Sequence, residues 1–133
     1  MKNMLVVTSG IVAMILSTTT HAGSREDLLT QYAAAAKTSG FSAARGQTLH
    51  TQNFSGGKPD TPSCTTCHGK DTRGAGRALT GKTIEPVAVS VTPTRYTDPA
   101  KVEKWFKRNC TEVLGRECTP QEKGDWLTFV IGQ

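Results

Sequence analysis

Apolar residues form one nearly unbroken run near the N-terminus and, after it, shorter groups at helical spacing. The run extends from Met4 to Ser17, follows Lys2, and is followed by Thr20-His21-Ala22. A short positive start, an apolar stretch and small residues before a cleavage point are typical of a secretory signal peptide. The run is also shorter than the ~20 apolar residues that span a bilayer. We therefore predict a signal peptide over residues 1–22 and one mature domain over residues 23–133, with no membrane insertion once the signal is removed.

The rest of the chain has the pattern of helices joined by long loops. Ser24 with Asp27, Asp98 followed by Pro99, and the capping box Thr119-Pro120-Gln121-Glu122 are all helix start signals. The predicted helices are residues 24–37, 42–52, 98–108 and 119–131. Between the second and third, residues 69–97 are rich in Gly, Thr and Pro, which predicts a loop that wraps around something. The predicted fold class is all-α, with about four helices and long loops.

Removal of the predicted signal changes the composition in two ways. All three methionines lie in it, so the mature chain keeps no methionine and only two histidines, His50 and His68. Loss of Lys2 leaves 15 of the 16 basic side chains against 11 acidic ones, a net charge of about +4. This balance predicts acidic partners or surfaces. No stretch is basic enough to form an arm that binds nucleic acid, so we interpret the excess of positive charge as a solvated surface rather than as a binding site.

The candidate chemistry lies in the segment Cys64-Thr65-Thr66-Cys67-His68. C-x-x-C-H is the attachment motif of c-type haem. One helical turn brings Cys64 and Cys67 to one side, where both thiols can add to the haem vinyl groups, and His68 then serves as the proximal iron ligand. The predicted export delivers the chain to the compartment where such haem is attached. We predict one covalent haem c and a periplasmic location.

Two other uses of a cysteine pair fit less well. A structural zinc site needs a second closely spaced pair, and Cys110 and Cys118 have seven residues between them rather than two to four. A thioredoxin-like dithiol needs a βαβ setting, which the flanking Gly, Thr and Pro residues do not supply. Residues 76–83 also match the P-loop pattern, but that motif requires a preceding buried strand and a following helix. Neither the strand nor the helix is predicted here, and Pro86, three residues after Thr83, does not favour a helix at this point.

The two remaining cysteines, Cys110 and Cys118, are expected to form a disulfide in an exported protein. Closing so short a loop stabilises the fold by about 2.5 kcal/mol on the chain-entropy estimate. The bridge follows Asn109, which we place just after the end of the helix over residues 98–108. We therefore expect the disulfide to fix the loop that carries Asn109.

The distal side of the haem stays open at this point. A methionine ligand is excluded by the composition of the mature chain, which leaves His50, a lysine, a weaker ligand or an open site. His50 lies four residues after Gly46 in a predicted helix, a spacing that favours packing against Trp126 and Phe129 of the C-terminal helix. We interpret His50 as a packing residue rather than a ligand.

Several segments resemble the sphaeroides haem protein (SHP) family of monohaem c-type cytochromes, which is related to cytochrome c″. The longest is GGKPDTPSCTTCHG at residues 56–69. The others are Thr80-Gly81-Lys82, Thr97-Asp98, Lys101-Val102-Glu103-Lys104-Trp105, Arg108-Asn109-Cys110 and Leu114-Gly115-Arg116-Glu117-Cys118-Thr119-Pro120. Together they cover nearly the whole mature chain, so residues 23–133 are predicted to be a cytochrome c domain with a class I-like fold.

The resemblance also implies a set of site residues. In that family an asparagine just before the first cysteine of a disulfide is the sixth iron ligand, which is Asn109 here, and the disulfide is Cys110–Cys118. Cytochrome c″ has histidine at this position. An amide oxygen is a hard, weak donor that suits ferric better than ferrous iron. Asn109 is therefore expected to leave on reduction, so that the ferrous haem binds O₂, NO or CO.

Further pocket residues and the redox partners are also expected rather than derived from the motif itself. Trp105 and Phe106 are expected to form part of the haem-pocket wall, and Arg95, Lys82 and Arg77 to meet the haem propionates. A carbonyl from residues 80–86 is expected to orient the ring of His68. Members of the family that this chain resembles are associated with a small dihaem cytochrome c and a membrane cytochrome b. The resemblance therefore implies these two proteins as redox partners. Electron transfer is the predicted function, and an enzyme or sensor that reduces, senses or detoxifies O₂ or NO is the alternative.

Overall fold

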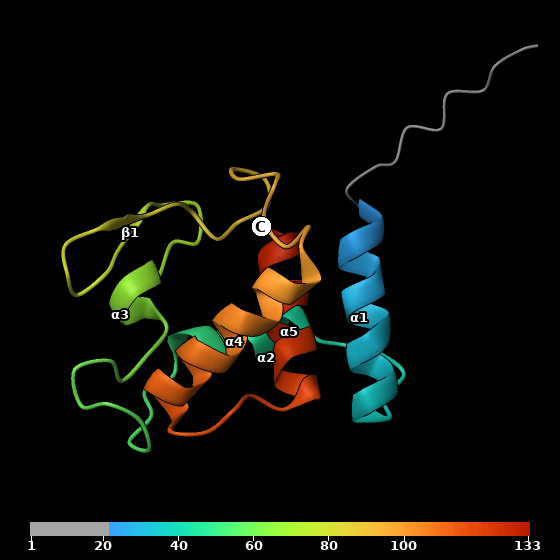
Figure 1. Ribbon diagram of the computed structural model, residues 1–133, viewed down its shortest axis with the longest axis horizontal. Coiled ribbons are helices and arrows are strands. Elements are labelled where there is room, and N and C mark those ends of the chain that lie inside the picture. The colour runs from blue at the N-terminus through green and yellow to red at the C-terminus, as the bar shows by residue number, and fades with distance from the viewer. Residues whose placement is uncertain (1–21) are drawn as a thin grey trace, which may run out of the picture.

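The computed structural model describes residues 22–133 as five helices and one small hairpin (Figure 1). In chain order the elements are α1 (Ala22–Ala36), α2 (Ala43–Thr51), α3 (Thr65–His68), β1 (Gly76–Arg77), β2 (Thr83–Ile84), α4 (Pro99–Leu114) and α5 (Pro120–Ile131). The predicted signal peptide lies outside the described residues except for Ala22, where α1 begins. Among the helices of the described part, none is both long and apolar enough to cross a membrane. The predicted all-α class is confirmed, and the single turn α3 is the helix beyond the four expected.

Local hydrogen bonds define where three helices begin. The Ser42 hydroxyl accepts a bond of 3.2 Å from the backbone N–H of Arg45 before α2. The Asp98 carboxylate accepts one of 3.1 Å from Lys101 before α4. Before α5 the bonds between Thr119 and Glu122 are reciprocal, at 3.2 Å and 2.8 Å, and form a complete capping box. Each cap satisfies backbone N–H groups that have no partner within the helix. The predicted starts of these helices are confirmed.

The end of α4 differs from the prediction. The helix continues past Arg108 to Leu114 and stops at Gly115, whose φ of 74° is left-handed. The reason is that Cys110, Val113 and Leu114 are buried and extend the apolar stripe of Val102 and Phe106. Asn109 therefore lies inside a helix, not in a loop after it. The expectation that the disulfide fixes a loop at Asn109 is wrong.

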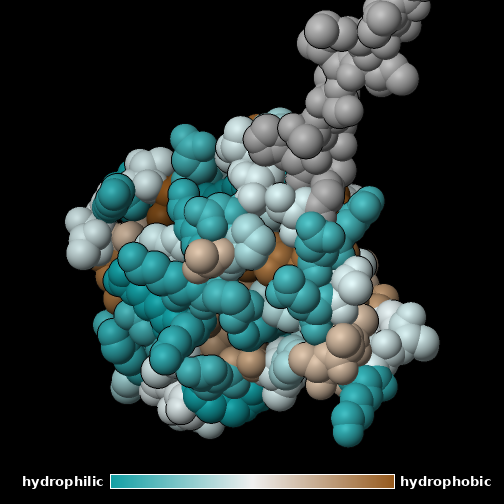
Figure 2. Space-filling model, turned by 45° about the vertical axis from the view of Figure 1, so that its right-hand side comes forward, coloured by the Kyte–Doolittle hydropathy of each residue, from teal (hydrophilic) through white to brown (hydrophobic). Residues whose placement is uncertain are grey.

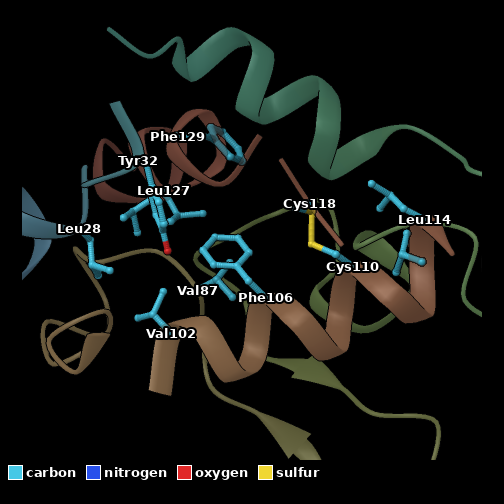
Figure 3. Packing of buried hydrophobic residues seen from close by; sticks show 12 residues of the cluster. Leu28, Tyr32, Val87, Val102, Phe106, Cys110, Leu114, Cys118, Leu127 and Phe129 are labelled. Carbon is cyan, nitrogen blue, oxygen red and sulfur yellow. A yellow bond between two sulfur atoms is a disulfide. The ribbon is translucent and has the colours of Figure 1, made fainter. Parts of the chain in front are cut away.

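The hydrophobic core lies where α1, α4 and α5 meet (Figure 3). Tyr32 of α1 and Phe106 of α4 pack edge to face with ring centroids 6.2 Å apart. Leu28, Leu127 and Val130 are almost completely buried beside them. The face shown in Figure 2 is mainly hydrophilic, and its hydrophobic residues show mostly in recesses between polar ones. One core thus holds the three longest helices together.

The predicted loop over residues 69–97 is confirmed, with one addition. Residues 76–84 form an antiparallel hairpin in which Gly76 pairs with Ile84 and Arg77 with Thr83. No helix follows this segment directly, so the match to the P-loop pattern lacks the helix N-terminus that would hold phosphate. Further on, Val87 and Ala88 are buried, and the N–H of Val89 donates to the carbonyl of Val130 at 3.1 Å. The loop is therefore anchored on α5.

The packing of α2 on α5 depends on a glycine and a buried carboxylate. A Cβ at Gly46 would lie 2.1 Å from the carbonyl oxygen of Asp125, so only glycine permits this approach. The carboxylate of Asp125 accepts bonds from the Ser42 N–H at 2.7 Å, from Arg45 at 2.7 and 2.9 Å, and from Gln121 at 3.0 Å. Burial raises the pKa of Asp125, but these bonds outweigh it and hold that pKa below its usual value. The charged carboxylate is therefore part of the α2–α5 interface.

Asp125→Asn should lower the free energy of unfolding by about 2–4 kcal/mol at pH 7, because a buried, multiply bonded charge is removed. The folded-state pKa of Asp125 is lowered, so its contribution is present above the pKa of an unfolded aspartate, about 3.9, and is lost as the pH falls through the folded-state pKa. Urea unfolding at several pH values measures this. The exposed Asp60→Asn is the control. Equal stabilities of the Asp125 and Asp60 variants at pH 7 would contradict the assignment.

Candidate functional site

The single turn α3 places the two free cysteines and His68 on one short segment. Cys64 is the N-cap of the turn, and its carbonyl accepts bonds from the N–H groups of Cys67 at 3.3 Å and His68 at 3.0 Å. Both thiols are free and half-buried. A single turn separates the sulfur atoms by less than an extended chain would, and it leaves His68 as the next residue. The geometry suits attachment of one flat group to both sulfurs.

Hydrogen bonds hold this segment in place from the outside. Ser63 is buried, and its hydroxyl donates to the carbonyl of His50 at 3.1 Å. The same hydroxyl oxygen accepts from the N–H of Thr65 at 3.2 Å. At the other end, Gly69 adopts a φ of 71°, which ends the turn. The turn is thus fixed at the residue before Cys64 and at the residue after His68.

The ring of His68 is available as a ligand. Burial lowers the pKa of His68 to about 4, and the nearby His50 and Arg95 contribute to the same shift. The imidazole is therefore neutral at pH 7, which is the form that binds metals. Its Nδ1 atom is buried and has no hydrogen-bond partner among residues 22–133. The expected carbonyl from residues 80–86 does not accept a bond from this atom, so that prediction is wrong.

The protonation state of the Cys64 thiol fits covalent attachment better than a thiolate site. Burial raises the pKa of Cys64 to about 11, so the sulfur is a protonated thiol at pH 7. A thiolate metal ligand or a reactive dithiol needs a lowered pKa instead. Across residues 22–133, no three His, Cys, Asp or Glu side chains are grouped to hold a metal ion. A haem iron needs only one such ligand on its proximal side, and His68 is a neutral imidazole that could supply it, so the residues present fit a haem.

The hairpin packs directly on α3. A Cβ at Gly76 would lie 2.2 Å from the carbonyl oxygen of Cys67 and 3.1 Å from the Cα of His68. Figure 1 shows β1 next to α3, on the side of the molecule away from α1. The sequence reasoning missed this contact, since Gly76 stood out only as the start of the P-loop pattern. A glycine shortly after a haem-attachment motif is the signal that could have suggested it.

The predicted pocket residues on α4 point in different directions. Phe106 is buried in the core, with its ring centroid 5.6 Å from that of Trp126. Trp105 is 45% exposed, and the guanidinium of Arg108 lies 5.4 Å from the centre of its ring. Trp105 and Asn109 are four residues apart and share one face of α4. Trp105 therefore lies with Asn109, and Phe106 lies with the core.

The predicted propionate partners are also placed differently from one another. The guanidinium of Arg95 donates to the carbonyls of Pro86 at 2.7 Å and Glu85 at 2.6 Å. Its positive charge contributes to the lowered pKa of His68. Arg77 donates to the carbonyl of Gly81 at 3.4 Å, within the hairpin. The side chain of Lys82 is exposed on the same hairpin. Of the three, Arg95 is the one whose charge contributes to the lowered pKa of His68.

Asn109 lies next to the disulfide and near the segment that precedes Cys64. It is half-buried, and its side chain makes no hydrogen bond to any residue that the structure describes. The sulfur atoms of Cys110 and Cys118 are bonded at 1.98 Å, with Cα atoms 5.5 Å apart (Figure 3). One turn further along α4, the carbonyl of Glu112 accepts bonds from Lys58 at 2.7 Å and Thr61 at 3.3 Å. The segment that precedes Cys64 is therefore held against α4 one turn after Asn109.

His50 is placed as a packing residue, as predicted. Its side chain is fully buried, with its ring centroid 5.8 Å from that of Phe129. Both ring nitrogens are engaged, Nδ1 with Trp126 at 3.2 Å and Nε2 with the carbonyl of Gly69 at 2.9 Å. Neither nitrogen is free to bind a metal in this arrangement.

Comparison with known proteins gives one consistent relationship. Residues 36–130 match a family model described as a domain of unknown function, DUF1924. The chain is 57% identical over 91 residues to the cytochrome c-type protein SHP of Cereibacter sphaeroides, covering 68% of this chain and 70% of that protein. It is 31% identical over 87 residues to cytochrome c″ of Methylophilus methylotrophus, covering 65% of this chain and 60% of that protein.

Solved structures agree with these relationships. The structure of oxidised SHP, an oxygen-binding cytochrome c, matches with a TM-score of 0.79 at 52% identity, over 82% of this chain and 96% of that one. Oxidised cytochrome c″ from Methylophilus methylotrophus matches with a TM-score of 0.70 at 28% identity, over 84% and 95%. The fold and the Cys64–His68 turn define a c-type cytochrome, with haem c as its cofactor. Within that class, the chain belongs to the SHP family.

Gly76→Ala should disturb the site, because its Cβ would collide with the backbone of α3. We expect a loss of about 1–3 kcal/mol in the free energy of unfolding, typical of overpacking, and a smaller fraction of chains with covalent haem. Urea unfolding and the ratio of haem to protein measure the two effects. Gly40→Ala is the matched control, because nothing lies within 4 Å of the position that its Cβ would take. Equal behaviour of the two variants would show that the hairpin does not support the turn.

Proposed function

We propose that this protein is an electron-transfer cytochrome whose single haem c is attached through Cys64 and Cys67 and ligated by His68 and Asn109. Asn109 binds in the ferric state and leaves on reduction, which opens a position for O₂, NO or CO. The observation that carries the proposal is the pairing of a neutral, unbonded His68 with two free thiols on one turn. A neighbouring helix presents Asn109 with its amide unbonded to the described residues.

The protein's part in this chemistry is to hold and orient. When bound, the haem supplies the one-electron couple and the iron that takes a gas molecule. Cys64 and Cys67 fix it at two points by thioether bonds. Because Nδ1 of His68 is buried within the protein, Nε2 is the nitrogen left to meet the iron, and Nδ1 then carries the ring proton. Burial keeps the ring neutral and ready to donate a lone pair.

The position of Asn109 inside α4 limits how it leaves. Cys110 is bonded to Cys118 just ahead of α5, so the backbone at Asn109 is held by both helix and disulfide. Release on reduction is therefore a rotation of the Asn109 side chain rather than the movement of a loop. The oxidised SHP structure, which is that of an oxygen-binding cytochrome c, supports O₂ as the gas.

Charge on α4 supports a redox partner with an acidic surface. Lys101, Lys104, Lys107 and Arg108 are exposed on this helix, and helical spacing puts Lys101 and Arg108 on the side of Trp105 and Asn109. A small dihaem cytochrome c and a membrane cytochrome b are the partners that we propose, with a periplasmic location that follows from the predicted signal peptide. A second function, the reduction or detoxification of O₂ or NO, is favoured by the oxygen-binding relative. Turnover of O₂ or NO under excess reductant would distinguish it from electron exchange alone.

The covalent haem is tested by mass. Protein purified from the periplasm of a host that attaches c-type haem should have the mass of residues 23–133 plus one haem. Replacing Cys64 and Cys67 with serine should abolish the covalent addition, because no thiol remains to form a thioether. A wild-type mass without haem would contradict the central assignment.

The ligand role of Asn109 is tested by two substitutions and a control. Asn109→Ala should change the ferric spectrum from six-coordinate to water-bound or five-coordinate and leave the ferrous spectrum nearly unchanged, because the amide acts in one oxidation state. Asn109→His should favour low-spin ferric iron and slow CO binding after reduction by at least about tenfold, since an imidazole that occupies nine tenths of sites leaves one tenth open. The exposed Asn53→Ala is the control. An unchanged ferric spectrum in Asn109→Ala would mean that Asn109 is not a ligand.

A further inference from the structure

The two hydrogen bonds of the His50 ring fix its protonation state by themselves. The indole N–H of Trp126 can only donate, so Nδ1 of His50 must present a lone pair at 3.2 Å. The carbonyl of Gly69 can only accept, so Nε2 must carry the proton at 2.9 Å. The ring is therefore neutral and held in one tautomer. Its complete burial is consistent with this, because a buried polar ring is tolerated when both nitrogens are bonded.

These bonds connect three separate parts of the fold. Trp126 belongs to α5, His50 to α2, and Gly69 is the residue directly after His68. In addition, the backbone carbonyl of His50 accepts from the hydroxyl of Ser63, directly before Cys64. One residue thus holds the attachment segment at both of its ends. The rings of His50 and His68 lie 6.5 Å apart between centroids, with no bond between them.

Packing alone does not explain the choice of residues. His50 sits among the rings of Trp126 and Phe129, where a hydrocarbon ring would fill the same space without the cost of burying two nitrogens. What the imidazole adds is a donor aimed at the peptide that follows His68. Gly69 ends α3 with a left-handed φ, and no atom lies within 4 Å of the position that a Cβ would take there.

We propose that His50 is a positioning residue for the proximal ligand, and that the bonds from Trp126 through His50 to Gly69 set the orientation of His68 on the iron. This inference rests on the proposed function, in which His68 is that ligand. The bond from Nε2 restrains the peptide after His68. The bond from Trp126 keeps the ring proton on Nε2, so Nε2 always has a proton to donate to the carbonyl of Gly69. Loss of either bond leaves the His68 ring less well defined.

The first test reads the tautomer directly. Nitrogen-15 NMR of the holoprotein in its diamagnetic ferrous, CO-bound form should show His50 protonated at Nε2 alone, and the Trp126 indole N–H should exchange slowly with solvent. A His50 signal protonated at Nδ1, or at both nitrogens at pH 7, would overturn the proposal.

The second test reads the effect on His68. His50→Phe retains a ring and removes both bonds, whereas Trp126→Phe removes only the donor to Nδ1. Resonance Raman spectra of the ferrous protein should show a shifted or broadened iron–histidine band in His50→Phe and a smaller change in Trp126→Phe. The CO dissociation rate of His50→Phe should change by about fivefold, the size expected for loss of the one bond that reaches Gly69. Phe129→Leu is the control, because Phe129 packs on the same ring without bonding to it, and its band should match wild type.

The outcomes separate this inference from the proposed function. If the wild-type protein carries haem but shows no iron–histidine band, the assignment of His68 fails and this inference fails with it. If the band is present and unchanged in both His50→Phe and Trp126→Phe, His50 is a packing residue only, and the proposed function stands. If His50→Phe does not fold, Trp126→Phe decides, with a changed band in support and an unchanged band against.

Discussion

The close approach of α2 to α5 at Gly46 is the contact on which the rest of the structure depends. A Cβ at Gly46 would overlap the backbone of Asp125, so the two helices meet at a distance that other residues do not allow. Two groups of bonds become possible at this distance. On one side, Ser42 and Arg45 satisfy the carboxylate of Asp125. On the other, His50 comes within hydrogen-bond distance of Trp126.

The attachment turn is held by this pair of helices rather than by its own length. A single turn of helix has little stability by itself, because the cost of nucleation is not offset by further bonds. Here the turn is fixed from α2 by the carbonyl and the ring of His50, and it is backed by the hairpin at Gly76. The loop after the hairpin returns to α5 through Val89. The site is thus assembled from segments that are each too short to hold it alone.

The other side of the site is set by α4, which is a rigid support for Asn109. The helix runs without a break to Leu114, and the disulfide joins its later turns to the start of α5. The backbone at Asn109 is accordingly held at two places, and the side chain is the part left free to change. In the function that we propose, a weak ligand carried on such a fixed backbone would return to the same place after each release.

The sequence alone determined the attachment motif, the helix starts and the helical class, because the signals involved act over a few residues. The spacing of Cys64, Cys67 and His68, the caps at Ser42, Asp98 and Thr119, and the shortage of other ligands are all local features or simple counts. The tertiary structure decided where α4 ends, since burial of Cys110, Val113 and Leu114 continues the helix beyond the predicted end at Arg108. It also decided the contact between Gly76 and α3, and the bond between Trp126 and His50, which are 76 residues apart in the chain. Such contacts depend on how close whole helices and loops come to one another, and that distance is set by the packing of the complete chain.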